Sequence, residues 1–116
     1  MKYNSITAFV PSGKDFQKSK ELFLELGFCI NWEADDYVGF ENNGCSFVLQ
    51  NYDNKEFAEN FMMSVKVGDL HGFWNEVSSL GLQEKFGVKI TPPKQFPWGR
   101  EVNLIDPAGV CWHFTE

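Results

Sequence analysis

Four residues near the end of the chain have side chains suited to chemistry or to ligand binding. His113 carries an imidazole that can transfer a proton near neutral pH, and Cys111 is a potential nucleophile two residues before it. Arg100 has a planar guanidinium that suits recognition of a carboxylate, and Trp98 can stack on a planar ligand. What these residues can do depends on which of them share one surface.

Each of these side chains also has a purely structural interpretation. His113 can be a general base or a ligand-binding group, but also an inert polar residue bonded to a neighbour. Cys111 and His113 are alternate residues of a strand, so their α-carbons lie nearly 7 Å apart. No third group is evident to orient them as a catalytic pair. A buried inert thiol is therefore favoured for Cys111. Trp98 can simply fill the core, and Arg100 can be a solvated charge at a strand end. The other histidine, His71, is expected on an exposed helix surface without a function.

The end of the chain predicts two strands joined by a tight turn. Residues 106–109, Asp-Pro-Ala-Gly, fit a type I turn, with Asp first, Pro second and Gly fourth. With a simple two-residue loop, Val102 lies opposite His113 and Arg100 shares the face of His113. A bulge would instead place Glu101 on that face and reverse the charge of the site.

The rest of the chain follows similar patterns. Asp15 is a plausible helix N-cap and Gly27 a helix stop, and the same interval separates Asp69 from Gly81. Alternating apolar residues predict the strands, and a less regular stretch leads to Pro92-Pro93. We expect strands over residues 6–10, 28–33, 37–41, 45–52 and 61–67, followed by the terminal hairpin.

The equal cap-to-stop intervals, and the match of strand 45–50 to strand 110–115, indicate a duplicated βαβββ unit. The predicted fold is α+β, with two tandem βαβββ modules forming a curled mixed sheet. It is organised as one domain over residues 1–116, with a first module over 4–52, a connector over 53–60 and a second module over 61–116.

Alternation also predicts which side chains line the open surface of such a fold. Bulky apolar residues such as Phe47, Leu49, Trp112 and Phe114 are expected to face the helices, which leaves the opposite faces to smaller residues of mixed polarity. Two sheets side by side would curl into a cup typical of small-molecule sites. The predicted ligand-binding residues are Phe9, Val48, Gln50, Met62, Ser64, Trp98, Arg100 and His113, with Trp32 a weaker stacking candidate.

The composition restricts the possible partners. Ten basic and 16 acidic residues give a net charge of −6, which argues against nucleic acid or an anionic membrane as a partner. Three cysteines without CxxC spacing argue against a disulfide framework or a zinc knuckle. With no signal-peptide or membrane-spanning pattern, we expect a cytoplasmic protein.

The doubled unit, the Leu26-Gly27-Phe28 helix stop and the Trp98-Gly99-Arg100…Asp106-Pro107-Ala108-Gly109 hairpin resemble the vicinal oxygen chelate superfamily. This superfamily includes glyoxalase I, extradiol dioxygenases and the fosfomycin- and bleomycin-resistance proteins. The opening Val10-Pro11-Ser12…Asp15-Phe16 is most similar to the bleomycin-resistance branch, although Gly13 is an extra residue there. The resemblance implies the glyoxalase/bleomycin-resistance fold and a homodimer.

Metal-dependent members of this superfamily place His, Glu or Gln at four positions of the cup. The corresponding residues here are Thr7, Val48, Met62 and His113, or Gln50 after a shift of two in one strand. Because one His, or one His and one Gln, is a poor divalent-metal site, we expect neither a metal nor a cofactor.

Three functions follow. The first is a metal-free small-molecule-binding protein that holds an aromatic or amphipathic ligand, as the bleomycin-resistance branch does. The second is a glyoxalase-superfamily lyase, isomerase or dioxygenase, either with a metal or with a metal-free mechanism centred on His113. The third is a protein whose cup is filled by its own side chains and whose surface interacts with a partner.

Overall fold

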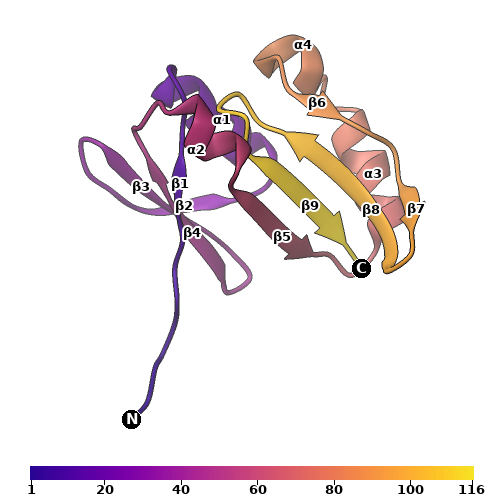
Figure 1. The fold of residues 1–116 in the computed structure, drawn as a ribbon, viewed down its shortest axis with the longest axis horizontal. Coiled ribbons are helices and arrows are strands. Elements are labelled where there is room, and N and C mark those ends of the chain that lie inside the picture. Colours follow the sequence, from indigo (N-terminus) through magenta and orange to yellow (C-terminus); the bar gives the residue numbers. More distant parts are fainter.

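The computed structural model describes residues 1–116 as two mixed sheets and four helices (Figure 1). In chain order the elements are β1 (Phe9–Pro11), α1 (Phe16–Glu25), β2 (Cys29–Glu33), β3 (Tyr37–Asn42), β4 (Cys45–Gln50), α2 (Lys55–Glu59), β5 (Met62–Lys66), α3 (Leu70–Ser78), α4 (Leu82–Phe86), β6 (Lys89–Ile90), β7 (Lys94–Phe96), β8 (Gly99–Ile105) and β9 (Cys111–Thr115).

The two sheets repeat one topology. The N-terminal sheet has the order β1-β4-β3-β2, and the C-terminal sheet has the order β5-β9-β8-β6, with β7 also paired to β8. In each sheet the strand that comes first in the chain pairs in parallel with the strand that comes last. That last strand also pairs in antiparallel fashion with the strand before it in the chain. The predicted α+β fold of two βαβββ units is therefore confirmed.

The helices begin where the sequence places their caps. The Asp15 carboxylate accepts the Lys18 backbone N–H at 3.0 Å, and Asp69 accepts that of Gly72 at the same distance. The prediction of a less regular stretch between Gly81 and Pro92 is wrong for its first residues. Helix α4 begins directly after Gly81 and buries its apolar residues in the core. No helix of the four has the length and apolarity needed to cross a lipid bilayer.

One core lies between the helix-covered faces of the two sheets. The Trp112 ring lies 5.1 Å, between centroids, from both Phe23 of α1 and Phe47 of β4. Further along the same face of β9, the ring of Phe73 of α3 lies 4.5 Å, between centroids, from that of Phe114. Since the helix-covered faces meet in this core, each sheet has a second, open face, and the two sheets share no backbone pairing that would join these faces within one chain.

The first predicted strand is shorter than expected. β1 begins at Phe9, because β4 pairs only with residues 9–11. Residues 1–8 form neither helix nor strand and extend away from the body of the molecule (Figure 1). Ile6, predicted to lie inside this strand, is 99% exposed.

Candidate functional site

The turn between β8 and β9 decides which side chains face the open side of the C-terminal sheet. The Gly109 N–H donates to the Asp106 carbonyl at 3.0 Å, which confirms the predicted type I turn. Gly109 then adopts a φ of 108°, and the Asp106 N–H donates to the Val110 carbonyl at 3.0 Å. The hairpin therefore has a three-residue loop closed by a glycine, because a type I turn alone does not match the twist of the strands.

The Asp106 side chain holds this loop together. Its Oδ1 accepts the backbone N–H groups of Ala108, Gly109 and Val110 at 3.0–3.1 Å, and its Oδ2 accepts the Trp112 indole N–H at 2.9 Å. Burial raises the pKa of Asp106 to about 6, although all four hydrogen bonds act to lower it. The carboxyl group is thus a structural element of the hairpin.

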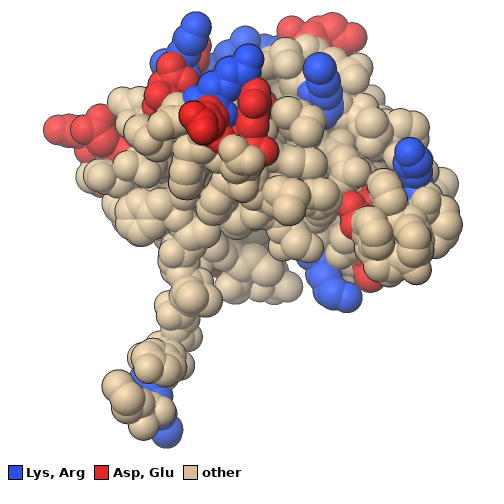
Figure 2. Space-filling model, in the orientation of Figure 1, with Lys and Arg blue, Asp and Glu red and all other residues tan.

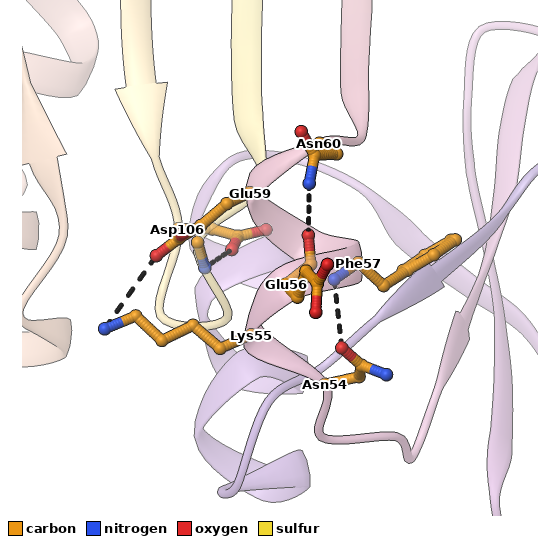
Figure 3. A network of polar contacts seen from close by, with 8 residues as sticks. Asn54, Lys55, Glu56, Phe57, Glu59, Asn60 and Asp106 are labelled. Atoms are coloured by element: carbon orange, nitrogen blue, oxygen red, sulfur yellow. Dashed lines mark hydrogen bonds and ion pairs between the residues drawn. The ribbon is translucent and has the colours of Figure 1, made fainter.

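The connector helix α2 supports the same loop from outside. Figure 3 shows α2 beside the turn, with Lys55 and Glu59 of the helix next to Asp106. A Cβ atom at Gly109 would lie 3.3 Å from the Glu59 Cγ, so the helix and the loop are in close contact. The Asn54 side chain caps α2 by accepting the Phe57 N–H at 2.9 Å.

The three-residue loop shifts the strand register by one residue from the expected pairing. Asn103, not Val102, lies opposite His113, and Glu101 therefore shares the face of His113. Of the two alternatives predicted for this face, the structure has the one with Glu101 and not the one with Arg100. Arg100 points to the other side, where its guanidinium pairs with the Glu116 carboxylate at 3.3 Å.

Glu101 links two predicted site residues on the open face of the C-terminal sheet. Its Oε1 lies 2.8 Å from the His113 Nδ1, and its Oε2 accepts the indole N–H of Trp98. Glu101 is only 5% exposed. Burial acts to raise the pKa of Glu101, but the hydrogen bonds from His113 and Trp98 outweigh it and lower the pKa below its ordinary value. Glu101 is therefore an ionised acceptor for both rings.

Two polar atoms beside this chain of contacts have no partner. The His113 Nε2 and the Oδ1 of Asn103 are both buried, and neither makes a hydrogen bond. Ser64 of β5 flanks His113 on its other side. Cys111 lies on the same face, where burial, followed by the charges of Glu101 and Asp106, raises the pKa of its thiol. A thiol that holds its proton is a poor nucleophile, which supports the inert interpretation of Cys111.

An aromatic pair forms the rim of this face. The rings of Phe96 and Trp98 stack with centroids 5.1 Å apart and an angle of 9° between planes. The Lys94 ammonium lies 5.6 Å from the Phe96 centroid. Trp98 is 71% exposed even though Phe96 and Glu101 fix its ring. Such a ring offers a stacking surface that is already ordered.

The open face of the N-terminal sheet is built around a glycine. A Cβ atom at Gly39 would lie 2.1 Å from the Trp32 Nε1, so the indole of Trp32 lies directly over β3. A β-bulge between Ile30 and Trp32 shifts the register of β2 at this point. Val48, 6% exposed, pairs with Gly39 on one side and with Phe9 on the other. The result is a row of apolar side chains across three strands.

The remaining predicted residues are divided between the two open faces. Gln50 lies beside Tyr37 in the N-terminal sheet, whereas Met62 and Ser64 lie beside Cys111 and His113. A groove of about 480 Å³ reaches Ser64 from the side of the N-terminal arm. In Figure 2 charged side chains gather along the edge formed by α1, α2 and α4, and the middle of the visible face is uncharged.

The residues at the four expected metal positions do not fit a metal ion. Thr7 lies on the exposed N-terminal arm, Val48 is apolar, and Met62 offers only a thioether. The fourth, His113, already directs its Nδ1 to Glu101. No three His, Cys, Asp or Glu side chains lie close enough to form a metal site.

Comparison with solved structures identifies the fold. A bleomycin-binding protein in complex with bleomycin superposes with a TM-score of 0.82, at 22% identity and 98% coverage of both chains. The chain has the bleomycin-resistance fold. The bleomycin-resistance determinant of transposon Tn5 gives a TM-score of 0.80 at 22% identity, covering 98% of each chain. TnmS3, an antibiotic-binding protein from Streptomyces sp. CB03234, gives 0.72 at 22% identity, covering 100% of this chain and 99% of its own. No protein-family model and no curated protein sequence matches the chain.

Proposed function

We propose that this chain is a small-molecule-binding protein that holds a planar ligand against its open sheet faces without a metal or cofactor. The observation that carries the proposal is the fixed but exposed ring of Trp98, held by Phe96 and Glu101. An ordered aromatic ring in solvent can stack on a ligand without losing further conformational freedom. Solved proteins with the same fold include a bleomycin-binding protein complexed with bleomycin and an antibiotic-binding protein.

The ligand contacts come from both faces in this proposal. The proposed binding residues are Phe9, Val48, Gln50, Met62, Ser64, Trp98 and His113, together with Trp32. Glu101 takes the place of Arg100 in the predicted set, as the residue that positions Trp98 and His113. The aromatic rings supply contact area and the polar groups of the C-terminal sheet orient the ligand.

A homodimer would complete the site. The two open faces of one chain belong to separate sheets, and both expose large apolar side chains, among them Phe9, Trp32, Met62 and Trp98. The N-terminal arm adds exposed Tyr3 and Ile6. Sedimentation equilibrium tests this assembly, since a mass of one chain, 13.3 kDa, at micromolar concentration would contradict it.

We assign the protein to the cytoplasm because all three cysteines, Cys29, Cys45 and Cys111, are free thiols. Fractionation of cells producing the protein tests this assignment. Recovery in a secreted or periplasmic fraction would contradict it.

Binding itself is tested by NMR titration with bleomycin and with the neutral bicyclic compound 2-naphthamide. Shifts of the Trp98 indole cross-peak that saturate with added probe support the proposal. We expect Trp98→Ala to weaken binding at least about tenfold, because it removes the apolar area buried by the ring as well as about 1 kcal/mol of stacking. Trp98→Phe, which keeps a ring, should retain most of the affinity. Unchanged spectra with every planar probe would overturn the proposal.

A further inference from the structure

A groove on the helix-covered side of the molecule is lined by residues of both βαβββ units. It has a volume of about 310 Å³, which is within the range of small-molecule sites. Leu26, at the end of α1, and Phe28 line it from the first unit, and Phe73 of α3 and Phe114 of β9 line it from the second. All four side chains belong to the core or pack against it. This helix-side groove therefore has an apolar lining.

The helix-side groove continues along the free edge of β5. It is lined there by residues 65–68, and the groove of about 480 Å³ beside the N-terminal arm is lined by residues 63–66. The two grooves share Phe28, Cys45, Val65 and Lys66, so they follow each other along one strand edge. Such an elongated path suits an alkyl chain, which can bend along it and bury its methylene groups.

The charges along this path are of one sign. Lys66 lines both grooves and forms no ion pair, and neither groove is lined by an Asp or a Glu, in a chain with 16 acidic and 10 basic residues. Because β5 is an edge strand, the flexible Lys66 side chain can lie along the apolar lining and keep its ammonium in water at the rim. An unpaired cation beside an apolar groove is complementary to a ligand with an apolar body and one negative charge.

We propose that the helix-side groove binds a free aliphatic monocarboxylate, with its alkyl chain along β5 between the two units and its carboxylate at the Lys66 ammonium. This site goes beyond the proposed function, because Trp98, Glu101 and His113 line neither groove. Ser64, in the groove beside the arm, is the one residue common to this site and the proposed planar-ligand site.

Four probes separate the contribution of the chain from that of the charge. They are octanoate, hexanoate, octanol and octylammonium, each titrated into the full chain and followed by ¹H–¹⁵N NMR. We expect octanoate to shift the backbone cross-peaks of Phe28, Val67 and Gly68 until they saturate, while the Trp98 indole cross-peak stays unchanged. Octanoate should bind about tenfold more tightly than hexanoate, because it buries two more methylene groups. Octanol should bind about threefold more weakly than octanoate, and octylammonium more weakly still.

The same titrations can overturn the proposal. Cross-peaks of the groove that do not saturate, or shifts centred on Trp98, would show that octanoate does not occupy this groove. Equal affinity for octanoate and hexanoate would contradict burial of the chain. Octylammonium bound as tightly as octanoate would contradict selection by Lys66.

A pair of lysine variants tests the charge directly. Lys66→Met keeps a long apolar side chain but removes the ammonium, and the ratio of octanoate to octanol affinity should fall to about one. Lys89→Met removes the same charge from β6, where the lysine is exposed, forms no ion pair and lines neither groove, so the ratio should not change. An equal fall in both variants would show attraction by net charge alone and would overturn the proposal.

The exposed thiols provide a measurement that needs no substitution. Cys45 lines both grooves, whereas Cys29 is equally a free, exposed thiol and lines neither. Octanoate should slow the alkylation of Cys45 by chloroacetamide in proportion to its occupancy, with no effect on Cys29, as followed by mass spectrometry. Alkylation of Cys45 at the same rate with and without saturating octanoate would overturn the proposal.

Discussion

The two open faces share one topology but present different chemistry. The N-terminal face is a row of apolar side chains in which Trp32 lies over Gly39, next to Val48 and Phe9. The C-terminal face has a connected polar chain at the equivalent place, from Trp98 through Glu101 to His113. Apolar area contributes affinity with little preference for orientation, whereas hydrogen bonds fix direction. In the proposed binding function, the two faces divide these tasks between them.

The faces also differ in how they are held. Gly39 makes room for Trp32 by its lack of a side chain, so the N-terminal face depends on local packing. The C-terminal face depends on a register that the Asp106 loop sets several residues away from the site. Variants at these two support points should therefore damage the faces separately.

Removal of the Asp106 carboxyl group should have the largest effect. Asp106→Ala leaves the backbone N–H groups of Ala108 and Val110 and the Trp112 indole without an acceptor, whereas the Gly109 N–H keeps the carbonyl of residue 106. We expect the free energy of unfolding to fall by about 3 kcal/mol or more, measured in urea. Asp36→Ala in the β2–β3 turn is the control. That carboxylate accepts only one exposed side-chain hydrogen bond, from Asn51, and its loss should cost less than about 1 kcal/mol. Equal losses would contradict the special role of Asp106.

Glu101 and Asp106 each accept an indole N–H, but their pKa values should be shifted in opposite directions. The pKa of Asp106 is raised to about 6, and that of Glu101 is lowered. The folded chain thus holds the Asp106 proton more tightly than the unfolded chain, whose Asp pKa is about 3.9. Through Asp106, the free energy of unfolding should fall by up to about 3 kcal/mol as pH rises from well below 4 to well above 6. Stability due to Glu101 is instead present above its unfolded pKa and is lost as pH falls through the lowered folded value. Carboxyl ¹³C shifts measure both groups, and an Asp106 midpoint near 4 would contradict the expectation.

A methyl group at position 39 should disrupt the N-terminal face alone. In Gly39→Ala the new Cβ would occupy the place of the Trp32 ring, which must move away from β3. We expect a loss of about 1–3 kcal/mol of stability and weaker binding of 2-naphthamide. Gly68→Ala is the control, because a Cβ there meets no atom within 4 Å. Unchanged affinity of Gly39→Ala for 2-naphthamide would show that the N-terminal face does not contact the ligand.

The sequence predicts the parts of this molecule that depend on local patterns. Asp15 and Asp69 cap their helices because the side chain and the N–H groups it accepts lie within one turn. The duplicated topology follows from the repeated interval between cap and glycine. The predicted strand over residues 6–10 is wrong for residues 6–8, because alternation shows that a segment can be a strand, but not where it leaves the strand beside it.

The site was less predictable because it depends on one residue of register. The sequence did contain the signal for the longer loop, since Asp-Pro-Ala-Gly predicts a type I turn, and two-residue hairpins need the mirror-image types. No local pattern indicates that Trp32 lies over Gly39, because that contact joins two strands across a bulge. The unpartnered His113 and Asn103 atoms likewise follow only from the observed pairing.

Arg100 provides the test with the smallest expected effect. Its guanidinium faces away from His113 and forms an exposed ion pair with Glu116, so Arg100→Ala should cost less than about 1 kcal/mol of stability. Binding of 2-naphthamide and of 2-naphthoate should change by less than about twofold. With the two-residue loop, Arg100 would lie on the face of His113, and its removal would selectively weaken the naphthoate anion. Such a loss, measured by calorimetry against Glu33→Gln as an exposed ion-pair control, would show that the register places Arg100 and not Glu101 beside the ligand.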